Sequence, residues 1–190
     1  NTGQYCNKFR FDRGFDKVVV NNLFIMDGIE LNRPETRKKY NIKTKYRLVG
    51  TNYGSYDNTF TAEHEEVVVS TNAFSYEEYL ELRNLNLMFL GVFTLDFHKW
   101  FFQFIRSQNI SLSDFFSRFM NPDRKVNWPD GYIRFVDDFR AAAEGELFDT
   151  REEMVKKAKE IFAANGNDVG TPTRLNGLFS SRLIYLDTTV

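Results

Sequence analysis

The chain has 190 residues, the length of one domain or of one domain with part of a second. Its 25 basic residues nearly balance its 26 acidic ones, and the net charge of −1 lacks the basic excess typical of nucleic-acid-binding domains. Cys6 is the single cysteine, which excludes an internal disulfide or a multi-thiolate metal site and favours a cytoplasmic protein, and no apolar stretch has the length of roughly 18–20 residues that spans a bilayer.

The first 70 residues predict short strands and loops. The β-branched run at 18–20 continues into the apolar residues 23–26, which fits a strand buried on both faces, as in a parallel sheet. A proline-opened helix is expected over 35–40. The turn-rich residues 51–58 predict an irregular loop, and 65–70 predict a second strand.

The rest of the chain predicts helices. Capping boxes, each a Ser or Thr followed three residues later by Glu, open helices at Ser75 and Thr150. We expect helices over 75–107 (with a kink near Gly91), 111–120, 129–146 and 151–164, while 175–186 fits either a helix or a strand. The sequence therefore predicts an α+β, predominantly helical fold, with a strand and loop segment over 1–72 and a domain of four to five helices over 73–190.

Aromatic residues are concentrated in one of these helices. The chain has 20 Phe, and residues 89–105 are apolar nearly all round the helix. We expect this face to belong to the core. The alternative is a docking face for another part of the protein, for a partner or for self-association.

Three groups of polar residues are candidate sites. Lys43, Lys45 and Arg47 alternate at the period of a strand, so they could present a basic edge to the phosphate or carboxylate of a substrate, or simply form a solvated rim. Residues 63–66 combine His64 with three carboxylates, but only two of the four share each strand face, and we expect a solvated strand entry rather than a metal site. The lone His98 could be an acid–base residue facing a cleft, but we expect a packed or partly exposed histidine, and no second histidine at metal-ligand spacing accompanies it.

The order of several segments resembles a known family. An apolar strand at 23–26 is followed by the turn Gly28-Ile29-Glu30, a short helix, the basic stretch from Lys43 to Arg47, the strand at 65–72 and the helix opening at 74–79. Over residues 15–90 this order resembles the end of the barrel in radical S-adenosylmethionine (radical SAM) proteins of the cobalamin (B12)-binding type.

The resemblance implies a piece from the C-terminal side of a larger enzyme, a view that the missing initiator Met also favours. It implies a partial (β/α) barrel whose N-terminal part, absent here, is the chain's partner and holds the 4Fe–4S cluster, S-adenosylmethionine and cobalamin. The family's C-x3-C-x2-C motif is also absent, so the chain is expected to be an accessory fragment that is not catalytic alone. The alternative is a non-catalytic helical protein-interaction module.

Overall fold

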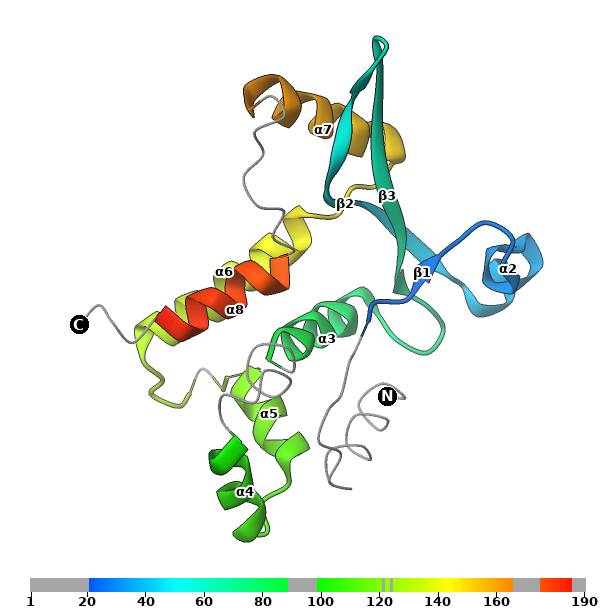
Figure 1. Cartoon of the computed structure of the whole chain (residues 1–190). Coiled ribbons are helices and arrows are strands. Elements are labelled where there is room, and N and C mark those ends of the chain that lie inside the picture. The colour runs from blue at the N-terminus through cyan, green and yellow to red at the C-terminus, as the bar shows by residue number, and fades with distance from the viewer. Residues whose placement is uncertain (1–20, 89–98, 121, 124, 166–174, 186–190) are drawn as a thin grey trace. The chain divides into compact units, whose positions relative to one another are not determined.

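The computed structural model describes residues 21–88, 99–120, 122–123, 125–165 and 175–185. The chain divides into two compact units (Figure 1). The sheet unit comprises residues 22–76 and 143–174, and the helical unit comprises 77–142 and 175–190 with the first 21 residues. The fold is α+β and predominantly helical, which confirms the predicted class.

The sheet unit contains a three-stranded antiparallel sheet. Its strands β1 (Phe24–Ile25), β2 (Lys43–Tyr56) and β3 (Thr59–Ser70) lie in the order β1-β3-β2. Phe24 pairs with Val67 and Ile25 with Glu66. The predicted parallel pairing of 23–26 is therefore wrong: β1 is a short edge strand held by an antiparallel neighbour, with Leu23 and Met26 exposed. Residues 18–20 lie outside the described residues.

The long hairpin of β2 and β3 also corrects the loop predicted for 51–58. β2 continues to Tyr56, and only Asp57 and Asn58 form the turn, both with positive φ (46° and 63°). Such φ values favour Asp and Asn in two-residue hairpin turns. The strand β2 is irregular near the start of this segment: its register with β3 shifts between Leu48 and Tyr53, and Gly50 has a φ of 57°. The turn-forming residues of the sequence therefore mark an irregularity inside the strand.

A short helical segment joins β1 to β2. It consists of the 3-10 helix η1 (Glu30–Asn32) and α2 (Pro34–Tyr40). Pro34 occupies an early helical position, and Asn41 ends the helix in the left-handed conformation with its N–H donated to the carbonyls of Arg37 and Lys38. The helix predicted over 35–40 is confirmed.

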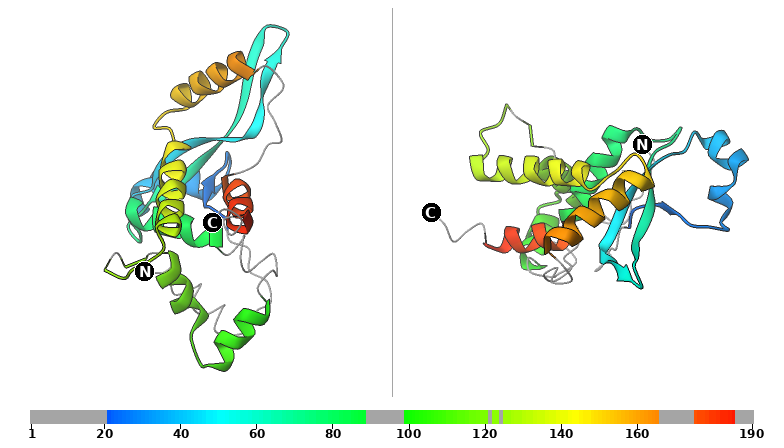
Figure 2. Two further views of the ribbon diagram at one scale, coloured as in Figure 1. Left: turned by 90° about the vertical axis from the view of Figure 1, so that its left-hand side faces the viewer. Right: turned by 90° about the horizontal axis from the view of Figure 1, so that it is seen from above.

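The helix α7 (Arg151–Asn165) belongs to the sheet unit and packs on the hairpin of β2 and β3 (Figure 2). The predicted capping box is present, because Thr150 Oγ1 accepts the N–H of Glu153 at 3.2 Å and Glu153 accepts the N–H of Thr150 at 3.3 Å. Phe162 packs edge-on against Phe60 of β3, with ring centroids 5.7 Å apart. The predicted division at 72 and 73 therefore differs from the observed units, since α7 packs on the sheet rather than with the other helices.

The helical unit is built on aromatic packing. Its helices are α3 (Tyr76–Met88), α4 (Lys99–Ser107), α5 (Leu112–Met120), most of α6 (Asp130–Gly145) and α8 (Leu175–Tyr185). Of the segment 175–186, which fitted either a helix or a strand, the described residues 175–185 are helical. Of the helix predicted over 75–107, α3 and α4 are seen, and the kink near Gly91 lies outside the described residues. Phe179 of α8 packs against Phe139 of α6 with ring centroids 5.1 Å apart, and Phe116 of α5 is fully buried.

Among the described helices, none combines the length and the apolar character that a membrane span requires.

Candidate functional site

The predicted basic residues of β2 have different environments. Lys45 and Arg47 lie opposite Val67 and Glu65 of β3, so their side chains share one face. The register shifts between Lys43 and Thr44, so the alternation does not extend to Lys43. Arg47 is the most enclosed of them: its Nε and Nη2 donate to Glu65 Oε2 at 2.8 and 2.5 Å, and its Nη1 donates to Glu146 Oε1 at 3.3 Å. The side chain is 16% exposed, so two protein carboxylates occupy this guanidinium.

Lys45 is paired more loosely. Its ammonium donates to Asp149 and lies 5.7 Å from the ring centroid of Tyr76. The hydrogen bond that Lys45 donates to Asp149 is the main reason that the pKa of Lys45 is raised, and burial opposes it. The carboxylate partner is 75% exposed, so water competes with this pair.

Lys43 remains the open member of the three. It is exposed, and within the described part of the chain no carboxylate pairs with it. Lys43 would therefore be available to a substrate anion, whereas Lys45 and Arg47 are already paired with carboxylates. The pairs of Lys45 with Asp149 and of Arg47 with Glu146 join β2 to the segment before α7, together with the backbone bridge between Tyr46 and Phe148.

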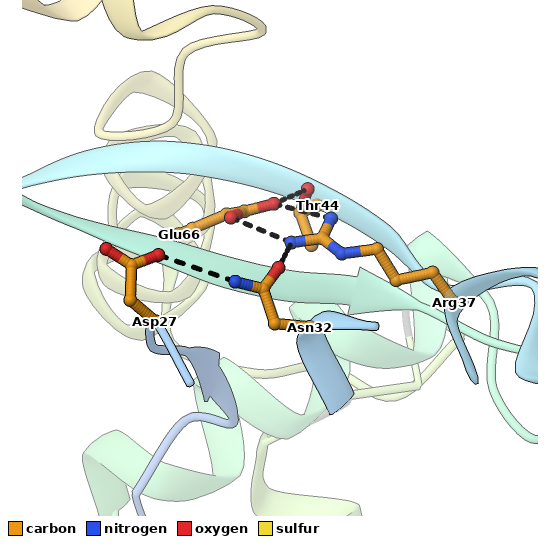
Figure 3. Close-up of polar contacts among 5 residues, drawn as sticks. All are labelled: Asp27, Asn32, Arg37, Thr44 and Glu66. Carbon is orange, nitrogen blue, oxygen red and sulfur yellow. Dashed lines mark hydrogen bonds and ion pairs between the residues drawn. The ribbon is translucent and has the colours of Figure 1, made fainter. Parts of the chain in front are cut away.

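The most connected polar group of the sheet unit lies on the other face of β2, around Glu66 of β3 (Figure 3). Arg37 of α2 donates from Nη1 and Nη2 to the two oxygens of Glu66 at 2.7 and 2.9 Å. Thr44 of β2 donates its hydroxyl to Glu66 Oε1 at 2.6 Å. We call Arg37, Thr44 and Glu66, together with Asn32 and Asp27, the Glu66 network.

The network extends from the sheet into the segment before α2. Arg37 Nη2 also donates to Asn32 Oδ1 at 2.8 Å, and Asn32 Nδ2 donates to Asp27 Oδ1 at 3.4 Å. Figure 3 shows the five side chains as one chain of contacts between β3 and the turn that follows β1. The network therefore fixes the turn and α2 against the sheet.

Electrostatics keep Glu66 ionised. Burial alone would raise its pKa, but the hydrogen bonds from Arg37 and Thr44 and the charge of Arg37 outweigh burial, so the pKa lies below its ordinary value. The pKa of Arg37 is raised, chiefly by its hydrogen bond to Glu66. With both oxygens engaged and a low pKa, this carboxylate is poorly suited to act as a general base.

The sequence analysis places Glu66 among the carboxylates at 63–66 and does not connect it with Arg37, which lies 29 residues earlier in the chain. A two-residue alternation can show which face of a strand each side chain takes. It carries no information about which helix covers that face.

The carboxylates around His64 divide as predicted. Glu66 and His64 lie on one face, where His64 packs on Tyr46 with ring centroids 5.9 Å apart. Glu65 pairs with Arg47, and Glu63 accepts a hydrogen bond from Asn52 at 2.8 Å. The described residues contain no group of three His, Cys, Asp or Glu side chains suited to a metal ion. His98 lies outside the described residues.

No protein-family model and no curated protein matches the sequence. A functional assignment therefore rests on the residues described above.

Proposed function

We propose that the chain is the C-terminal accessory region of a radical SAM enzyme of the cobalamin-binding type, and that it is not catalytic alone. The observation that carries the proposal is the Glu66 network. The turn at 28–30, the short helix, the stretch from Lys43 to Arg47 and the strand at 65–70 are the segments that resemble the family. Arg37, Thr44 and Glu66 bind three of these four segments to one another.

The pairing of the strands limits how much of a barrel the chain would supply. Strands of a (β/α) barrel run parallel, whereas β2 and β3 run antiparallel. Because β1 also pairs antiparallel with β3, we include the whole three-stranded sheet in the accessory region and assign the strands of the barrel to the N-terminal part of the polypeptide. Lys43 and Lys45 at the start of β2 remain the proposed contacts with a substrate anion.

The residues present do not fit the cofactors of such an enzyme. A 4Fe–4S cluster needs several thiolates, and Cys6 is the single cysteine of the chain. The cluster, S-adenosylmethionine and cobalamin would be held by the N-terminal part of the same polypeptide, in the cytoplasm. No chemical step is assigned to the residues of this chain.

The gene around the coding region of this chain tests the proposal. We expect the reading frame to continue upstream of Asn1 and to encode a C-x3-C-x2-C motif. A reading frame that opens near Asn1, or an upstream region without this motif, contradicts the proposal.

A second candidate is a helical module that binds another protein without catalysis. Trp100 and Phe104 of α4 favour it, because both are large aromatic side chains exposed to solvent. A reading frame that opens near Asn1 would support this candidate over the first.

A further inference from the structure

The end of α2 and the start of β2 carry three lysines, which we call the basic corner. Lys38 and Lys39 lie in the last turn of α2, and Lys43 is the first residue of β2. The N–H of Ile42 donates to the carbonyl of Arg37 at 2.9 Å, so the chain folds back on the last helical turn just before Lys43. Successive Cα atoms are about 3.8 Å apart, so those of Lys39 and Lys43 are separated by at most about 15 Å.

One uncharged segment, residues 70–72, borders the basic corner on both sides of the fold-back. Lys43 lies opposite Ser70 of β3. Asn72 donates its side-chain amide to the carbonyl of Lys39 at 3.0 Å, and its backbone N–H to the carbonyl of Tyr40 at 2.9 Å. These contacts bring the two ends of the corner to one segment, and its residues are Ser, Thr and Asn, so it supplies no carboxylate to neutralise the lysines.

The three ammonium groups of the basic corner have no carboxylate partner among the described residues, and all three side chains are exposed. The arginines beside them are paired: Arg33 with Glu30 at 3.0 Å, and Arg37 with Glu66 at 2.7 Å. Glu35, in the first turn of α2, is exposed and lies one helical turn before the two lysines of the last turn. Its carboxylate opposes one of the three positive charges, and the surface stays positive.

An exposed aromatic ring lies within the basic corner. Tyr40 is 45% exposed, and the ammonium of Lys39 lies 5.1 Å from the centroid of its ring. Proteins that bind single-stranded nucleic acid combine positive charges along the backbone with aromatic rings on which bases stack. An acidic peptide needs only the charges, and a duplex stacks its bases on one another. The combination of ring and lysines therefore favours a single strand.

We propose that the basic corner and Tyr40 bind single-stranded nucleic acid, with the lysines on neighbouring phosphates and a base on the ring. The net charge of −1 describes the whole chain, whereas this surface keeps its own positive charge. Lysines contact phosphates as point charges, so binding would depend little on the base sequence. The proposal rests on the anion contact proposed above for Lys43 and gives that anion a class. Oligonucleotide binding needs no cofactor, so its failure would leave the test of the upstream gene sequence untouched.

Fluorescence anisotropy of a fluorescein-labelled oligothymidylate, titrated with the full chain, tests the proposal. Three phosphate contacts predict that the affinity falls about 20-fold between about 50 and 200 mM NaCl. The variant K38Q/K39Q/K43Q should weaken binding at the lower salt concentration by at least about tenfold. Circular dichroism should show an unchanged fold, since the three side chains are exposed.

A charge-matched control separates the basic corner from the overall charge of the chain. K156Q/K157Q/K159Q removes three exposed lysines from α7, which belongs to the same unit, and should bind almost as the wild type does. Glu35→Gln should have the opposite effect and tighten binding by at least about twofold, because a carboxylate beside the lysines repels phosphate.

The aromatic ring is tested by Tyr40→Ala. We expect affinity to fall by at least about fivefold, the lower end of what one stacked base contributes. Tyr56→Ala, at the hairpin turn of the same unit, is the control: its side chain is 70% exposed, and we expect unchanged binding.

Four results would overturn the proposal. The first is a chain that does not bind the oligonucleotide at the lower salt concentration. The second is an equal loss of binding in the two triple-lysine variants, and the third is a Tyr40→Ala variant that binds like the wild type. The fourth is cosedimentation with vesicles of phosphatidylcholine and phosphatidylserine that is lost in K38Q/K39Q/K43Q, which would assign the basic corner to a membrane surface.

Discussion

The two units of the chain are held together by different interactions. In the sheet unit, Arg37, Lys45 and Arg47 pair with carboxylates that lie between 18 and 104 residues away in sequence. In the helical unit, aromatic rings from α4, α5, α6 and α8 pack on one another. The comparison teaches that a regular pattern of charges on a strand can serve to join distant segments, and that an excess of aromatic residues can serve both a core and a surface.

The largest expected effect concerns the aromatic core. Phe139→Ala should reduce the free energy of unfolding by about 3–5 kcal/mol, because a fully buried ring would leave a cavity. Phe139 also lies 5.8 Å from the guanidinium carbon of Arg83, so a buried cation would lose a ring contact. Urea denaturation followed by circular dichroism measures the change. Phe104→Ala is the matched control on an exposed ring, and a similar loss there would contradict the assignment of core and surface.

The second effect concerns the Glu66 network. Glu66→Ala should cost about 2–4 kcal/mol, since Arg37 and Thr44 would lose their acceptor in a setting where the carboxylate side chain is only 18% exposed. Glu63→Ala is the control on the same strand, because its partner Asn52 and the contact between them are exposed. Equal losses for the two variants would show that the network does not stabilise the sheet unit.

The pH dependence of stability follows from the same carboxylate. The pKa of Glu66 is lower in the folded protein than its ordinary value of 4.5, so the folded state favours the ionised form. Its contribution is therefore present above pH 4.5 and is lost as the pH falls below that value through the folded pKa. Thermal unfolding of the wild type should show this loss, and Glu66→Gln should reduce it. An unchanged profile in Glu66→Gln would contradict the assignment.

The smallest expected change in the free energy of unfolding concerns the two lysines of β2, Lys43 and Lys45. Lys45→Met should cost less than about 1 kcal/mol, because Asp149 is exposed and the pair is screened by water. The pKa of Lys45 is raised, so any contribution of the pair is present below the ordinary value of 10.5 and is lost as the pH rises above it. Lys43→Met should leave the free energy of unfolding unchanged, because the side chain is exposed. A measurable loss at Lys43 would reveal a partner for its ammonium.

Local signals predicted more of the fold than of the candidate site. The capping box at Thr150 and the proline at the start of α2 act within one helical turn, and the structure contains both features. The partners of Lys45 and Arg37 depend on which segments fold onto β2 and β3, which no local pattern encodes. The parallel pairing predicted for 23–26 was wrong for the same reason, because an apolar run specifies burial but not the direction of its neighbour.

The measurement that tests the central claim most directly is the iron content of the complete gene product, purified without oxygen. The proposed role predicts about four iron atoms per polypeptide, bound by cysteines upstream of Asn1. Replacing those cysteines by Ala should abolish the iron, while the Cys6→Ala variant should retain it. A complete gene product that binds no iron, or whose iron depends on Cys6 alone, would contradict the account.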